Sequence, residues 1–219
     1  MKTLLSLSAV AAMALGSAHA VVFSSVDRAT FAASVAQGTV DSQDFDGLAA
    51  GSTLLAPVDG VTYSASKGDA LVTDQFLTTT GVNGLGSTSI GFFEIDESAT
   101  FVFDVPITAF AIDVNTFSTD DGAYLATLNT GDSITSIFEV FPNQATGQFI
   151  GFTTDTAFTS VTITVIQASG GLPYTLDTLV FGDAGELVDP PEVPIPGALP
   201  LFLAGVGLFG ARKRLGKRA

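Results

Sequence analysis

The sequence has no cysteine and few of the side chains on which most catalytic sites depend. Its single histidine, His19, and both methionines, Met1 and Met13, lie in the first twenty residues, and tryptophan is absent. The rest of the chain therefore has no histidine or cysteine, which excludes a Ser-His-Asp triad, a cysteine nucleophile and the usual zinc sites. Chemistry that uses only carboxylates, hydroxyls, tyrosine or lysine stays open. Without disulfides, the fold must depend on its hydrophobic core alone.

Basic residues are also scarce over most of the chain. Residues 21–192 contain two, Arg28 and Lys67, against all 22 acidic residues, which gives this part a formal net charge of −20. A field of that sign repels nucleic acid and anionic membrane surfaces, so neither is expected as a partner of this region. A solvated acidic surface, bound divalent cations and cationic partners are all compatible with it.

The first twenty residues have the composition of a secretory signal peptide. Lys2 supplies a positive start, an apolar stretch follows over residues 4–15, and Ala18-His19-Ala20 fits the small-x-small cleavage rule. We therefore expect export through the Sec translocon, cleavage after Ala20 and a mature chain that starts at Val21.

The last 27 residues combine an apolar run with a basic end. Residues 193–211 carry no charge and would extend about 28 Å as a helix, close to the roughly 30 Å of a bilayer core. Prolines and glycines weaken that helix, so the segment predicts a marginal transmembrane anchor. The basic cluster that begins with Arg212, Lys213 and Arg214 acts as a membrane stop that stays in the cytoplasm. An ordinary permanent anchor and a buried apolar helix are the alternatives.

The order of these parts resembles a known sorting signal. Val193-Pro194-Ile195-Pro196, the apolar span and the basic terminus together are similar to the PEP-CTERM signal in its VPxP form, with Ile195 where the namesake motif has glutamate. The resemblance implies recognition by an exosortase of a bacterium that produces exopolysaccharide. It also implies temporary anchoring in the inner membrane, cleavage near the proline motif and delivery of the ectodomain to the cell surface or the extracellular space.

Between the two signals, the pattern predicts one all-β domain over residues 21–182 and a flexible linker over 183–192. A short helix is expected over residues 27–36, with Ser24 and Ser25 placed to cap it and with Phe31 and Val35 on one face. Period-two alternation then predicts ten or more short strands, at residues 39–46, 61–66, 70–73, 89–95, 100–105, 109–114, 123–129, 133–141, 148–153, 160–165 and 176–181. We interpret this as an antiparallel β-sandwich, jelly-roll-like, with one short N-terminal helix.

Two aspartates are candidate metal ligands. The sequences Asp44-Phe-Asp46-Gly47 and Leu176-Asp177-Thr178 close the first predicted strand and open the last, and the outline resembles lectin-like and carbohydrate-binding jelly rolls. In such folds, acids on the first and last strands can hold a structural Ca²⁺, which implies Asp46 and Asp177, with Asp44 as a further candidate. The alternative is that Asp46 caps a turn and Asp177 accepts backbone hydrogen bonds.

These observations favour a non-enzymatic protein of the cell surface or extracellular matrix, linked to exopolysaccharide or biofilm. The alternative is a carbohydrate-binding, lectin-like module, in which Tyr63, Tyr124 and Tyr174 are the only tyrosines that could stack on sugars. A hydrolase that uses paired carboxylates is the third hypothesis, and it requires two acids that face one cleft. The acids at 94, 96 and 97 are a sequence cluster of that kind.

Overall fold

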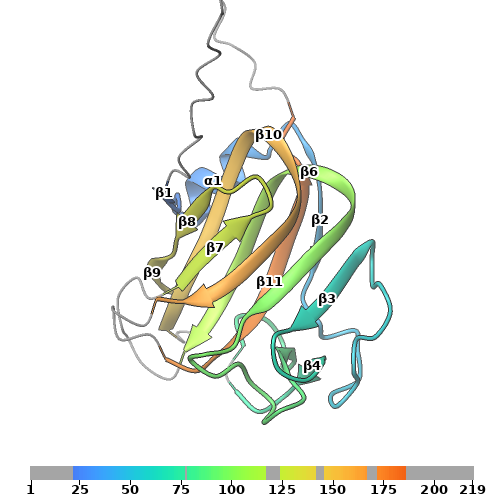
Figure 1. Ribbon diagram of the computed structural model, residues 1–219. Coiled ribbons are helices and arrows are strands. Elements are labelled where there is room, and N and C mark those ends of the chain that lie inside the picture. Colours follow the sequence, from blue (N-terminus) through green and yellow to red (C-terminus); the bar gives the residue numbers. More distant parts are fainter. Residues whose placement is uncertain (1–21, 77, 117–123, 142–145, 167–171, 186–219) are drawn as a thin grey trace, which may run out of the picture. The chain divides into compact units, whose positions relative to one another are not determined.

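The computed structural model describes residues 22–76, 78–116, 124–141, 146–166 and 172–185 (Figure 1). The predicted signal peptide, the cleavage site at Ala20 and the sorting signal over 193–219 lie outside the described residues. So does the linker from residue 186 onward. The start of the predicted linker is described and belongs to the folded body, because the last strand continues to Asp183 and Ala184 is buried.

The described residues form eleven strands and one short helix. In chain order they are β1 (Val22–Ser24), α1 (Arg28–Ser34), β2 (Thr39–Gln43), β3 (Val61–Ala65), β4 (Ala70–Thr73), β5 (Gly84–Ser87), β6 (Ala99–Thr116), β7 (Tyr124–Leu128), β8 (Ser133–Thr135), β9 (Ile137–Val140), β10 (Thr146–Val165) and β11 (Tyr174–Asp183). The order along the sheet is β1-β8-β7-β10-β6-β11-β5-β4, with β2 on β11, β3 on β6 and β9 on β10. All pairs are antiparallel except β1 with β8. The predicted all-β, antiparallel class with one short helix is confirmed.

Two long strands, β6 and β10, organise this sheet (Figure 1). They pair with each other in two segments that are separated by register shifts between Thr153 and Ser160 of β10. The first segment of β6 also pairs with β3, and its second segment pairs with β11. We expected two short strands in place of each long one. Pro106 lies between the paired segments of β6, where its missing N–H removes no bond from the ladder.

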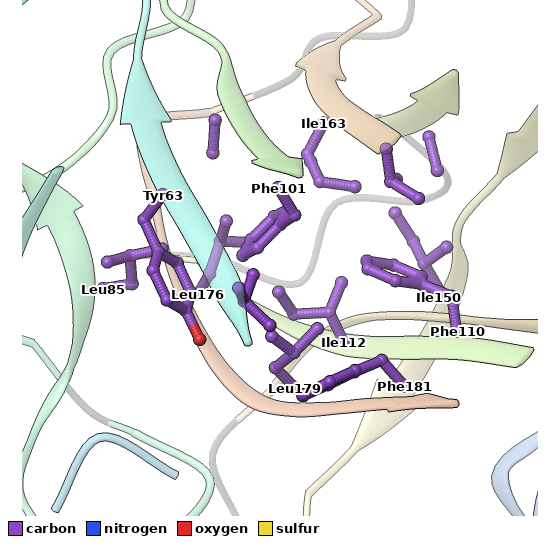
Figure 2. Close-up of a cluster of buried hydrophobic side chains, with 14 of the residues drawn as sticks. Tyr63, Leu85, Phe101, Phe110, Ile112, Ile150, Ile163, Leu176, Leu179 and Phe181 are labelled. Carbon is purple, nitrogen blue, oxygen red and sulfur yellow. The ribbon is translucent and has the colours of Figure 1, made fainter. Parts of the chain in front are cut away.

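The core lies between the two halves of the bent sheet. Phe101 and Phe103 from the first half of β6 contact Phe110 from the second half, with ring centroids 5.9 and 6.3 Å apart. Figure 2 shows side chains of β3, β6, β10 and β11 gathered in this space. This two-layered packing is what a sandwich requires, while the jelly-roll connectivity stays a prediction. Val105, at the end of the strand expected over residues 100–105, is 66% exposed, because it lies where β6 passes from one half to the other.

Helix α1 covers the outer face of the second half. Asp27 caps it, in place of the two serines before it, since its carboxylate accepts the backbone N–H of Thr30 at 3.0 Å. The buried ring of Phe31 packs edge-on against Phe149 of β10, at 6.2 Å between centroids. The helix and its buried face are therefore confirmed, although it ends at Ser34. Among the described residues, no helix is long and apolar enough to cross a membrane.

The strand expected over residues 89–95 is wrong. The strand here is β5, which begins five residues earlier, at Gly84. The chain then turns, and the Gly91 N–H donates to the Ser87 carbonyl at 2.8 Å. The sequence Gly84-Leu-Gly-Ser87 shows no useful alternation because two of its positions have no side chain. Glycine is needed at position 86, since a Cβ there would lie 2.2 Å from the Gly91 carbonyl oxygen.

Candidate functional site

A pair of buried acids lies on the outer face of the sheet, beside α1. Asp113 of β6 and Asp177 of β11 occupy partner positions, and both are 0% exposed. The register of β11 shifts directly after Asp177, and Thr178 adopts a φ of 50°, which is rare for a β-branched residue. Strained backbone and buried acids together are a reason to examine a site for function.

Arg28 neutralises one of these acids from the first turn of α1. Its guanidinium forms an ion pair with Asp113 and makes two 2.9 Å hydrogen bonds to Glu139 of β9. It also lies 4.6 Å from the centre of the Phe149 ring. Burial raises the pKa of Asp113, and the positive charge of Arg28 opposes that rise. The geometry is that of a structural ion pair that fastens the helix to the sheet.

Asp177 and Asp46, the two predicted metal ligands, hold the same loop. Asp177 accepts the backbone N–H of Thr80 at 2.8 Å, and Asp46 accepts the N–H groups of Val82 and Asn83 at 2.8 and 3.0 Å. Burial raises the pKa of Asp177 to about 7, although the N–H groups of Thr80 and Thr178 oppose this.

These are the alternative roles, a cap and a backbone acceptor, that the sequence analysis kept open. Within the described ranges, no three Asp, Glu, His or Cys residues are placed to hold a metal ion. A Ca²⁺ site at Asp46 and Asp177 stays a prediction.

The acids at 94, 96 and 97 form a second structural cluster. The buried carboxylate of Glu97 accepts the Ser89 hydroxyl at 2.9 Å and the Glu94 N–H at 2.8 Å, so it holds the turn after β5. Lys67 pairs with Asp96 at 2.6 Å and lies 3.7 Å from Glu94. Lys67 thus joins two turns, and the ion pairs and hydrogen bonds of this cluster indicate a structural role.

An open groove lies at the side of the sheet where β1, α1, β8 and the bend of β10 meet. Its volume is about 470 Å³. Val26, Ile134 and Phe152 supply the apolar part of its lining. The rest is polar and consists of Ser24, Thr30, Ser34, Asp132, Thr153, Thr154, Asp155 and Thr156. Apolar atoms make up most of the lining surface, and short polar side chains lie among them. Such a surface suits a ligand that has both hydroxyl groups and C–H faces.

Local structure fixes the walls of this groove. The Thr154 hydroxyl donates to the Thr156 carbonyl at 2.9 Å, which stabilises the bend of β10 between its two paired segments. Asp132 lies in the turn before β8 and accepts the Thr130 hydroxyl at 3.1 Å. Asp155 is exposed and has no hydrogen-bond partner among the described residues. The carboxylate of Asp155 is therefore free to interact with a ligand.

The sequence analysis missed this groove because its residues come from four separate segments. The available signal was the polar run at residues 153–156, which interrupts the alternation of β10. The tyrosines considered for stacking are all buried, with Tyr63, Tyr124 and Tyr174 at 3%, 1% and 0% exposure, so none forms an aromatic platform. Phe152, in the floor, is 6% exposed and offers little surface for stacking.

No family model matches the chain, and no curated protein matches it. Among solved structures it is similar to a mutant of CBM29-2 complexed with mannohexaose, at 10% identity and a TM-score of 0.35, over 69% of this chain and 98% of that one. It is also similar to a CBM29-2 mutant complexed with cellulohexaose, at 10% identity and a TM-score of 0.34, over 69% of this chain and 98% of that one. For a structure described as carbohydrate-binding module family 29, the identity is 10% and the TM-score is 0.33, over 71% of this chain and 99% of that one. Likenesses this low carry no weight in assigning a function.

Proposed function

We propose that the folded body is a non-catalytic module that binds polysaccharide, and that the groove between α1, β8 and the bend of β10 is its binding site. The observation that supports this most is the lining, in which six serine and threonine side chains lie around an apolar floor. The hydroxyls of Thr30, Ser34 and Thr154 donate within the protein and can accept from a sugar hydroxyl. The other three can both donate and accept. The C–H faces of a sugar ring match the apolar floor.

The affinity for a single oligosaccharide should be modest. Hydrogen bonds to the ligand replace hydrogen bonds to water, and each contributes only about 1 kcal/mol net. The nearly covered ring of Phe152 adds little stacking energy. Useful binding would then come from several copies that act together on a long polymer.

The binding test uses the full-length chain and a panel of soluble polysaccharides in affinity electrophoresis. Thr156→Trp should fill the groove, because Thr156 is exposed on its wall. Leu55→Trp is the matched control, at a residue that is 78% exposed and lies outside the groove. We expect retardation for the wild type and the control, and its loss for Thr156→Trp. No retardation by any polysaccharide, or equal retardation of both variants, would reject the proposal.

A hydrolase is the second candidate, because Asp132 and Asp155 line one groove. A glycosidase needs one acid that stays protonated in an apolar environment while its partner is ionised. Asp155 is exposed and Asp132 is half-buried beside the Thr130 hydroxyl, so neither has such an environment. Binding without hydrolysis is therefore favoured. Release of reducing ends that disappears in Asp132→Asn would establish the hydrolase instead.

We also propose that the module works outside the cell, as an exosortase substrate of the surface or matrix. The support is the sequence alone: the signal peptide that ends at Ala20, the motif Val193-Pro194-Ile195-Pro196 and the basic stop that starts at Arg212. The test is fractionation of the native host with an intact-mass measurement. Deletion of residues 193–219 should abolish membrane retention and C-terminal trimming. Unchanged location and trimming would reject this part of the proposal while leaving polysaccharide binding untouched.

A further inference from the structure

We infer that the groove prefers a polysaccharide with free amino groups over a neutral or acidic one. This inference rests on the proposed function and names the ligand class of the same site. Two carboxylates, Asp132 and Asp155, line the groove, and no lysine, arginine or histidine lines it. A ligand that enters the groove therefore meets two carboxylates in its lining.

Within the described residues, no basic side chain neutralises these carboxylates. Of the two basic residues in the described part of the chain, Arg28 is paired with Asp113 and Glu139, and Lys67 with Asp96 and Glu94. Neither lines the groove. The groove therefore keeps a negative potential, which is strengthened by the acidic body around it.

Charge complementarity then separates the classes of polymer. Uronic acids, sulfates and phosphates would meet repulsion from both carboxylates. A neutral sugar would have to displace water from them without offering a charge in return. A protonated amine supplies three donors and a positive charge, so it can form charge-assisted hydrogen bonds to a carboxylate. The hydroxyls of Thr30 and Ser34 on the α1 wall can still accept hydrogen bonds from the rest of the sugar.

The test compares glucosamine oligomers with N-acetylated oligomers of the same length, titrated against the full-length chain. At about pH 6 an ordinary amine is charged and an ordinary aspartate is ionised. We expect the amine form to bind up to about fivefold more tightly at low salt, since one exposed ion pair contributes at most about that factor. The preference should shrink as salt is added, because screening weakens exposed ion pairs.

Matched variants locate the effect. The double change Asp132→Asn and Asp155→Asn keeps the size of both side chains, and it should abolish the preference while weak binding of the acetylated oligomer persists. Asp104→Asn is the control, because Asp104 is an exposed acid on β6 outside the groove. It should keep the preference, and melting curves of both proteins check that they fold.

The outcomes are distinguishable from failure of the proposed function. Equal affinity for the amine and acetylated forms would overturn the inference and leave polysaccharide binding standing. An equal loss of preference in Asp104→Asn would also overturn it, since the effect would then be the general charge of the domain. Binding of neither oligomer nor any polysaccharide would reject both proposals.

Discussion

Asp113 and Asp177 face each other as partner residues of β6 and β11, and each is completely buried on the outer side of the sheet. They have different partners. Asp113 is paired with Arg28 of α1. Asp177 instead accepts the backbone N–H groups of Thr80 and of Thr178, the residue that follows it. One acid therefore holds the helix and the other holds the loop over residues 78–83, so this pair connects two covering segments to the sheet.

The first prediction concerns pH. The pKa of Asp177 is raised to about 7 in the fold, above its ordinary value of 3.8, so the folded chain binds a proton that the unfolded chain releases. The stability from this group is fully present below about pH 4 and is lost as the pH rises through about 7. Because Asp113 is shifted in the same direction, it adds to the trend.

The measurement is the melting temperature from pH 4 to pH 8, for the wild type and Asp177→Asn. The asparagine has no proton to release, so we expect a smaller decline in melting temperature across this range than in the wild type. It also loses one acceptor, which should lower stability by about 1 kcal/mol at acidic pH. The same pH slope in both proteins would show that Asp177 does not titrate in this window.

The second prediction concerns the ion pair between α1 and β6. Arg28→Met should destabilise the fold by about 3 kcal/mol or more, because it leaves the buried carboxylate of Asp113 without its cation. Asp113→Asn in the same chain should restore much of that loss, since no buried charge then remains. The free energy of unfolding in urea is the readout. A double variant no more stable than Arg28→Met would mean that the cost arises from lost packing on Phe149.

The third prediction concerns the turn after β5. Gly86→Ala should destabilise the fold by about 2 kcal/mol, because its Cβ would lie 2.2 Å from the backbone oxygen of Gly91. Gly47→Ala is the control, since a Cβ there would meet nothing within 4 Å. Chemical denaturation of both variants tests this. Equal stability of the two would show that the chain at residues 86–91 can move apart at no cost.

Much of the scaffold could be predicted from local pattern. Phe101 and Phe110 alternate with smaller or polar residues, and the structure buries both in the core. Phe31 and Val35 mark the face that α1 lays on the sheet. Such patterns can be recognised because each element buries one side in the core, and that side must be apolar.

Other parts of the fold depend on contacts between segments that are far apart in the sequence, and no local pattern indicates them. Ala109, Ala111 and Asp113 have the spacing of a solvent-facing row, yet α1 and the loop over residues 78–83 bury them. The continuity of β6 through Pro106 could not be seen, because proline usually ends a strand. The groove is formed by four separate segments, and the only sign of it in the sequence is the polar run at residues 153–156. The apolar pattern of a segment shows which of its faces is buried in the core, but it does not show which distant segments pack beside it.

The most direct test of the account is amide hydrogen exchange of the full-length chain, with and without a saturating soluble polysaccharide that retards it in electrophoresis. If the groove is the binding site, protection should increase in α1 and in residues 153–156 and stay unchanged in β3 and in the turn at residues 88–97. Protection confined to β3 and that turn, with none at the bend of β10, would contradict the assignment of the groove.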